Sequence, residues 1–155
     1  MSSEQNQSRP IGRREAMVGA AALGLGGLAA GASAKGIGTD DERPNHLAVL
    51  WTSADPDVAH RVALMYTHAA KRSGWFEQVR LIAWGPSQRT LVGDKDLRAK
   101  VQQMQADGVV LQACVVCADS YGIADRLREI GFEVLPMGVP LTRMLKAAGT
   151  EVVSF

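Results

Sequence analysis

Two thiols are the residues of this chain best suited to chemistry. Cys114 and Cys117 are the only cysteines among the 155 residues, and they lie three positions apart. The apolar run 108–113 leads into them and a polar segment follows. We interpret the run as a buried strand that ends at the thiols, where a helix begins. Because ligands bind at the carboxyl ends of strands in α/β proteins, the sequence predicts a functional site here with Cys114 and Cys117 as its catalytic residues.

The chemistry open to such a pair depends on the thiolate, which is the reactive form of cysteine. The N-terminus of a helix stabilises a thiolate through the aligned peptide dipoles, so we expect an activated pair at this junction. One thiol could accept a sulfur atom as a persulfide, and the second could attack that persulfide and release sulfide. The pair therefore fits a sulfur carrier or a thiol-based sulfurtransferase.

Several other interpretations of the cysteines stay open. Free cysteines are often simply packed in the core, and positions three apart at a helix start can also form a local disulfide. A dithiol oxidoreductase is a further alternative, although the intervening Val115 and Val116 are bulky. Zinc would need two further ligands, and we interpret the histidines, His46, His60 and His68, as solvent-exposed instead. No metal and no cofactor is predicted.

The first 34 residues have the layout of a bacterial export signal. Arg13 and Arg14 precede a run rich in Gly, Ala and Leu, and 32–34 is a small-residue cleavage site. This order is typical of a signal peptide, and paired arginines favour the twin-arginine route. We expect a signal at 1–34, a flexible leader at 35–45, a folded domain at 46–155 and a periplasmic protein. An uncleaved membrane anchor is the alternative, and after cleavage no stable membrane span is expected.

Short apolar runs alternate with helical patterns through the predicted domain. The expected strands are 46–52, 79–84, 108–114, 132–136 and 151–155, and the expected helices are 56–72, 96–106, 118–130 and 140–146. The segment 87–92 is uncertain and is compatible with a turn of helix. Strands that alternate with helices form parallel sheets with right-handed crossovers. The predicted fold is a three-layer α/β/α sandwich with a mainly parallel sheet of about five strands.

The first expected helix carries the clearest start signal. Asp55 suits the N-cap and Pro56 the first helical position. Val58, Val62, Met65 and Ala69 recur at helical spacing, together with the neighbouring Ala59, Tyr66 and Ala70. This spacing predicts that they face the core.

Residues beyond the cysteines complete the predicted site. Tyr121, Gly122 and Asp125 begin the segment after the thiols, and Met137 follows the next strand at the same edge of the sheet. We expect these four residues to line a substrate pocket, although an ordinary helix start and a plain turn explain them equally well. Trp51 and Trp84 end the first two strands, and we interpret them as aromatic residues at the rim of the core.

Net charge excludes some partners. The whole chain carries a formal charge of +1, and without residues 1–34 its basic and acidic side chains are equal in number. A nucleic-acid-binding domain normally shows a basic patch or stripe, and the body of this chain has no Lys/Arg run. We therefore expect no nucleic-acid partner. A chain of about 120 residues buries roughly two-thirds of its unfolded surface, so the fold does not require a disulfide.

The domain resembles the DsrE/DsrF-like family of small α/β proteins, which includes sulfur-relay subunits and YchN-like proteins. The resemblance covers residues 46–155 and rests on Leu111-Gln112-Ala113-Cys114 with Gly122 eight positions on. It also rests on the segments Tyr121-Gly122-Ile123-Ala124-Asp125 and Met137-Gly138-Val139-Pro140-Leu141-Thr142.

The resemblance implies a function. In the relay members the cysteine matching Cys114 carries the persulfide, so Cys114 is the expected sulfur carrier. Cys117 is similar to the second cysteine of the C-x-x-C form in YchN-like members and is the expected resolving thiol. The partners implied are a sulfur donor or acceptor protein, or a small persulfide, and further copies of the chain in a trimer or hexamer. A non-catalytic assembly subunit of the same fold is the alternative function.

Overall fold

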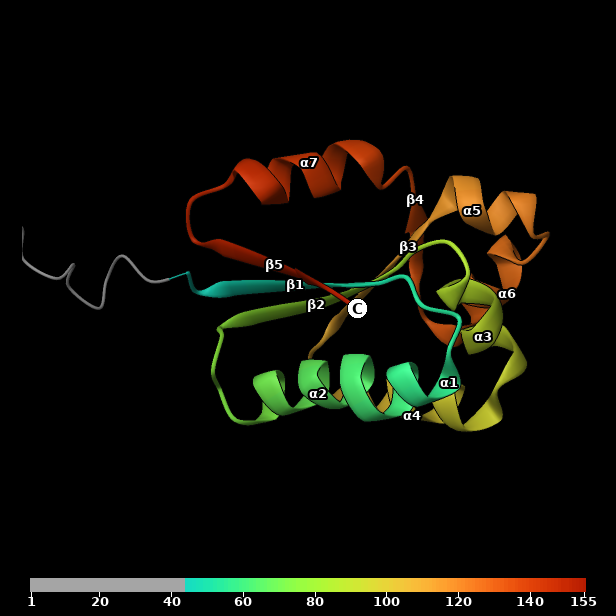
Figure 1. Cartoon of the computed structure of the whole chain (residues 1–155), viewed down its shortest axis with the longest axis horizontal. Helices are drawn as coiled ribbons and strands as arrows, with labels where there is room; N and C mark the ends of the chain where they lie inside the picture. Colours follow the sequence, from blue (N-terminus) through green and yellow to red (C-terminus); the bar gives the residue numbers. More distant parts are fainter. Residues whose placement is uncertain (1–43) are drawn as a thin grey trace, which may run out of the picture. The chain divides into compact units, whose positions relative to one another are not determined.

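The computed structural model describes residues 44–155, which contain the whole predicted domain (Figure 1). The predicted export signal and the leader as far as residue 43 lie outside the described residues. Five parallel strands form one sheet in the order β4-β3-β2-β1-β5. The strands are β1 (His46–Trp51), β2 (Gln78–Ala83), β3 (Val110–Cys114), β4 (Glu133–Leu135) and β5 (Thr150–Ser154). All five lie where the apolar runs predict them.

Helices connect every pair of consecutive strands. They are α1 (Pro56–Val58), the π-helical segment η2 (Ala59–Ala63), α2 (Leu64–Arg72), α3 (Ser87–Gly93), α4 (Lys95–Ala106), α5 (Val115–Ser120), α6 (Ala124–Ile130) and α7 (Gly138–Lys146). The uncertain segment 87–92 is therefore helical. The structure confirms the predicted α/β class, with helices on both faces of a parallel sheet.

Strand order explains why the two faces of the sheet are covered unequally. From β1 to β4 the chain steps in one direction along the sheet, and it then returns from β4 to the far edge beside β1 to form β5. Right-handed crossovers in opposite directions place their helices on opposite faces. The helices α2 and α4 thus lie on one face, and α7 lies on the other (Figure 1).

The core divides accordingly into a large and a small cluster. The large cluster holds most of the buried apolar side chains, among them Val49, Leu64, Leu81, Leu97, Val101, Met104, Leu111 and Leu127. The small cluster, on the α7 face, has four buried members, Ala48, Ile82, Cys114 and Met137. Leu141 and Met144 of α7 pack against it, yet α7 has no fully buried residue. The thiols therefore belong to the thinly covered face.

The first helix departs from the predicted core face. Asp55 accepts a hydrogen bond from the N–H of Asp57, and Pro56 is the first helical residue, as predicted. In η2, however, the N–H of Leu64 bonds to the carbonyl of Ala59, five residues back. This π turn holds one residue more than an α turn, so the buried face continues through Ala63, Leu64 and Thr67. The prediction that Val62 and Met65 face the core is wrong, since their exposed fractions are 38% and 57%.

The expected helix 118–130 is also wrong in part, because the structure contains two shorter helices there. Gly122 has φ +65° between α5 and α6, and a left-handed residue ends an α-helix. The amide of Gly122 closes a turn onto the carbonyl of Asp119. The second helix then begins at Ala124, so its axis is independent of the short helix that carries Cys117.

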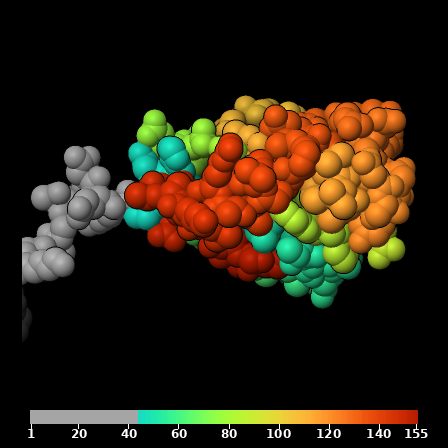
Figure 2. Space-filling model, turned by 90° about the horizontal axis from the view of Figure 1, so that it is seen from above, coloured from blue at the N-terminus to red at the C-terminus, as the bar shows by residue number. Residues whose placement is uncertain are grey.

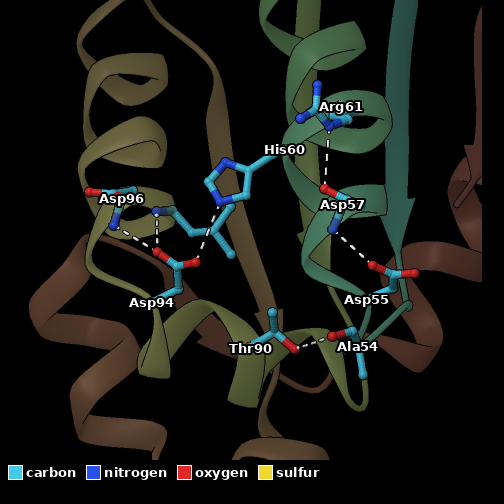
Figure 3. A network of polar contacts seen from close by, with 9 residues as sticks. Ala54, Asp55, Asp57, His60, Arg61, Thr90, Asp94 and Asp96 are labelled. Atoms are coloured by element: carbon cyan, nitrogen blue, oxygen red, sulfur yellow. Dashed lines mark hydrogen bonds and ion pairs between the residues drawn. The ribbon is translucent and has the colours of Figure 1, made fainter.

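By contrast, α4 follows its sequence pattern closely. Leu97, Val101 and Met104 are buried as predicted. Asp94 is its N-cap and accepts hydrogen bonds from the backbone N–H groups of Asp96 and Leu97 (Figure 3). Within residues 44–155 no helix has the length and apolar character needed to cross a membrane.

Candidate functional site

The two cysteines lie side by side at the carboxyl end of β3. Cys114 is the last residue of the strand and the N-cap of α5, and it is only 3% exposed. Cys117 is the third residue of α5, is half-buried and packs against the cluster that contains Cys114. Both thiols are free. The structure thus brings the predicted catalytic residues together, with one thiol covered and one partly open to solvent.

The electrostatic setting of Cys117 differs from the prediction. Burial raises the pKa of the Cys117 thiol, the backbone N–H of Gly85 lowers it, and the neighbouring Cys114 raises it again. The net shift is upward, so the expected stabilisation of a thiolate at the helix start is wrong for Cys117. The main reason is burial, which disfavours the charged thiolate, while α5 spans only six residues.

This upward shift predicts slow alkylation of Cys117 at neutral pH. A thiol with a raised pKa holds less thiolate below that pKa, so its reaction with iodoacetamide should need a higher pH than that of an unfolded thiol. We expect the midpoint of the pH–rate profile for Cys117, followed by peptide mapping, to lie above the midpoint measured in urea. A native midpoint equal to or below the urea value would contradict the assignment of burial as the dominant cause.

Two side chains at the start of α3 form hydrogen bonds to the ends of the strands around the thiols. The Ser87 hydroxyl donates to the carbonyl of Trp51, the last residue of β1, at 2.7 Å. The Gln88 amide Nε2 donates to the carbonyls of Ala83 and Cys114, the last residues of β2 and β3, both at 3.0 Å. Ser87 and Gln88 are fully buried. Two adjacent side chains therefore hold three parallel strand ends in register and fix the backbone of Cys114.

Gly85 gives the same loop its shape. It has φ +64° and is buried between β2 and α3. Only glycine adopts this conformation without steric cost, and the turn places its N–H at Cys117. Sequence reasoning missed Gly85, Ser87 and Gln88 as site residues. The one available signal was a Gly-Pro turn followed by polar residues at the carboxyl end of a predicted strand.

The predicted pocket residues are distributed unevenly around the cysteines. Met137 is fully buried in the same cluster as Cys114. Tyr121 ends α5 and its ring lies under the Arg89 guanidinium, 4.8 Å from the ring centroid. Gly122 is exposed in the turn that follows. The Asp125 side chain is 95% exposed and pairs with Arg128, so it does not line a pocket with the thiols.

The aromatic and histidine residues also differ from their sequence interpretation. Trp51 is fully buried rather than at the rim, whereas Trp84 is half-buried and packs against the cluster of Cys114. His68 is 4% exposed, so the prediction of a solvent-exposed histidine is wrong there. Among residues 44–155, no three His, Cys, Asp or Glu side chains form a group that could hold a metal ion.

Comparison with known proteins places this arrangement in a family. A conserved protein of unknown function from Bacteroides thetaiotaomicron, BT1422, is 30% identical, and the match covers 72% of this chain and 95% of BT1422 with a TM-score of 0.68. The chain belongs to the BT1422 family. YchN from E. coli matches 72% of this chain and 98% of its own at 17% identity, with a TM-score of 0.55. No family model matches the chain, and no curated protein matches it.

Membership of the BT1422 family carries no activity with it, since BT1422 is itself of unknown function. The likeness to YchN shows the fold, and YchN has a DsrE-like fold. The resemblance stated from the sequence is therefore confirmed at the level of the fold.

Proposed function

We propose that this BT1422-family chain is a sulfur carrier or sulfurtransferase that holds sulfane sulfur as a persulfide on Cys114. The observation that carries the proposal is the pair of adjacent, free thiols at the carboxyl end of a DsrE-like sheet. One of them is buried and the other half-buried. A covered thiol next to an accessible one suits a site that protects bound sulfur from water while a second thiol controls its release.

The proposed transfer of sulfur between thiols requires no cofactor. The Cys114 thiolate attacks the outer sulfur of a donor persulfide, the donor S–S bond breaks, and the donor leaves as a thiolate. An acceptor thiolate then takes the same sulfur, and Cys114 leaves as a thiolate. If Cys117 instead attacks the Cys114 sulfur, the bound sulfur departs as hydrosulfide and a Cys114–Cys117 disulfide remains. That disulfide requires an external dithiol before another cycle.

Intact mass measurement tests the carrier proposal directly. Reduced protein is mixed with inorganic polysulfide, freed of the donor, and weighed without reductant. We expect a gain of one sulfur atom per chain, or a loss of two hydrogens when Cys117 has resolved the persulfide. Dithiothreitol should restore the original mass in both cases. Protein that keeps its reduced mass at every donor concentration would rule out sulfur uptake.

The second candidate function is a homo-oligomeric assembly subunit, and exposed apolar side chains favour it. Val116 is 69% exposed between the cysteines, and Val139 is 61% exposed in the first turn of α7. Figure 2 looks down on α7 and α5, the helices that carry these two residues. A further copy of the chain is the partner that we propose for it. Light scattering during gel filtration should give a trimer or hexamer, and a monomer at all concentrations would reject this candidate.

We also propose that the protein is exported through the twin-arginine route, on the basis of Arg13 and Arg14 and the small residues 32–34. Export would bring the thiols from a reducing to an oxidising compartment, which makes the resolved disulfide the expected resting form there. Cell fractionation tests this proposal, since uncleaved precursor confined to the cytoplasm contradicts it.

A further inference from the structure

An open groove of about 500 Å³ lies between α2 and α4, on the large-core side of the sheet. Neither cysteine lines it, so it is separate from the thiol site. The residues that matter to its chemistry come from η2, α2 and α4 and include His60, Met65, His68, Ala69, Arg72 and Lys100. Its volume falls within the range of small-molecule sites, about 300–1,000 Å³.

The π-helical segment η2 sets the direction of the two histidines. In a regular α-helix, side chains eight positions apart differ by roughly 80° around the axis. The extra residue of the π turn reduces that difference to about 20°. His60 and His68 therefore both face α4, where His60 Nε2 lies 3.4 Å from Asp94 Oδ2 (Figure 3). Such single π turns occur frequently at functional sites.

A chain of hydrogen bonds holds Lys100 in the groove. The Lys100 ammonium donates to His68 Nδ1 at 2.7 Å, and His68 Nε2 lies 2.6 Å from Asp107 Oδ2. Because an ammonium group only donates, Nδ1 accepts and the ring proton is on Nε2, which donates to Asp107. His68 is buried, so its ring is fixed. His68 is thus a positioning residue. It accepts one of the three N–H donors of the Lys100 ammonium and leaves the other two available to a ligand.

The charges around the groove are predominantly positive. Within residues 44–155 no carboxylate lies in ion-pair distance of Arg72 or Lys100. The carboxylates of Asp94 and Asp107 bond to the histidines and do not line the groove, and Asp96, four residues before Lys100 on α4, does not line it either. The backbone N–H of Leu97 is the main cause that holds the pKa of Asp94 below its usual value, so this carboxylate is ionised as the α4 cap. Two cations are left without a carboxylate.

We propose that the α2–α4 groove binds a small organic phosphate monoester. Lys100 and Arg72 supply two positive charges that match a dianionic phosphate, and the guanidinium fork of arginine suits phosphate oxygens. Met65 and Ala69 supply apolar contact for the carbon portion. The ligand class follows from this combination of paired cations and an apolar wall, since a cation would be repelled and an uncharged molecule would leave both charges unused.

Calorimetric titration with glycerol 3-phosphate tests the proposal on the full chain. Saturable binding is expected for the wild type. The Lys100→Met variant should bind at least about tenfold more weakly, because one charge-assisted hydrogen bond contributes roughly 1.5–3 kcal/mol. The matched control, Lys146→Met, removes the same charge from exposed α7 and should bind as the wild type does.

Sulfur uptake provides an independent readout, since the groove is separate from the thiols. Lys100→Met should gain sulfur from polysulfide as the wild type does, and an unchanged circular dichroism spectrum and thermal unfolding midpoint show that the variant is folded. If both lysine variants bind glycerol 3-phosphate equally more weakly than the wild type, the loss of affinity comes from net charge alone, and the proposal is overturned. Tighter binding of malonate than of glycerol 3-phosphate would overturn the phosphate class, and absence of saturable binding by wild type would overturn the site.

Discussion

Cys114→Ser protein is expected to lose the sulfur adduct altogether, whereas Cys117→Ser protein should retain it and accumulate a stable persulfide. The difference follows from the proposed roles, in which Cys114 receives the sulfur and Cys117 attacks the persulfide afterwards. Intact mass after polysulfide treatment, with dithiothreitol reversal, measures both variants in one experiment. Released sulfide, assayed in parallel, should appear with wild type and be absent with Cys117→Ser.

Both serine variants should remain folded, which keeps the comparison interpretable. Each exchanges one sulfur for one oxygen in the small cluster and leaves the large cluster untouched. Circular dichroism and thermal unfolding provide the control. If Cys114→Ser gains sulfur to the wild-type level while Cys117→Ser does not, the carrier is Cys117 and the assignment by family resemblance is wrong. Equal loads on both variants would exclude a dedicated carrier thiol.

Gln88→Met is expected to reduce the free energy of unfolding by about 2–4 kcal/mol. The substitution keeps the length of the side chain but removes the two donors that bond to the carbonyls of Ala83 and Cys114. A net hydrogen bond contributes about 1 kcal/mol, and a buried group left without its partner costs about 1–3 kcal/mol. Urea denaturation measures the change in unfolding free energy.

Gln102→Met is the matched control for this prediction. Gln102 is an exposed residue of α4, and surface substitutions usually change stability by less than about 0.5 kcal/mol. A Gln88→Met protein as stable as the control would show that the strand ends do not depend on the α3 amide. The Gln88 Oε1 atom is buried and has no partner among residues 44–155, so the methionine also removes one unpaired acceptor and lowers the expected loss toward the smaller value.

Much of the fold was predictable because its signals are local. Continuous apolar runs such as Leu47–Leu50 are typical of buried parallel strands, and all five predicted strands are present in the structure. Asp55 and Pro56 mark a helix start by chemistry that acts within one turn. The π turn was not predictable in this way, because no residue type in 59–63 marks it as Asp55 and Pro56 mark the helix start. Gly122 was misread for a related reason, since a glycine within a helical pattern signals a break only when its φ is known.

The position of the candidate site was also predictable, but its environment was not. Cys114 and Cys117 are only three positions apart in the sequence, so their proximity at a strand end follows from the strand and the helix start alone. Gly85 and Gln88 contact them from roughly 30 residues away, through the pairing of β2 with β3. Only the register of that pairing brings the Gly85 N–H to Cys117, where it lowers the pKa of the thiol. Burial raises this pKa by more, and burial by distant segments is what reverses the simple expectation from the helix dipole.

The unequal covering of the sheet has a kinetic consequence for the thiols. Elements with few buried contacts open at low free energy, well below that of global unfolding. α7 has no fully buried residue, although Leu141 and Met144 cover the cluster that contains Cys114. Backbone amides of α7 should therefore exchange with deuterium faster than those of α4. The rate at which reagents reach Cys114 is then limited by the local opening of one C-terminal helix. The large core on the opposite face keeps the sheet folded during that opening.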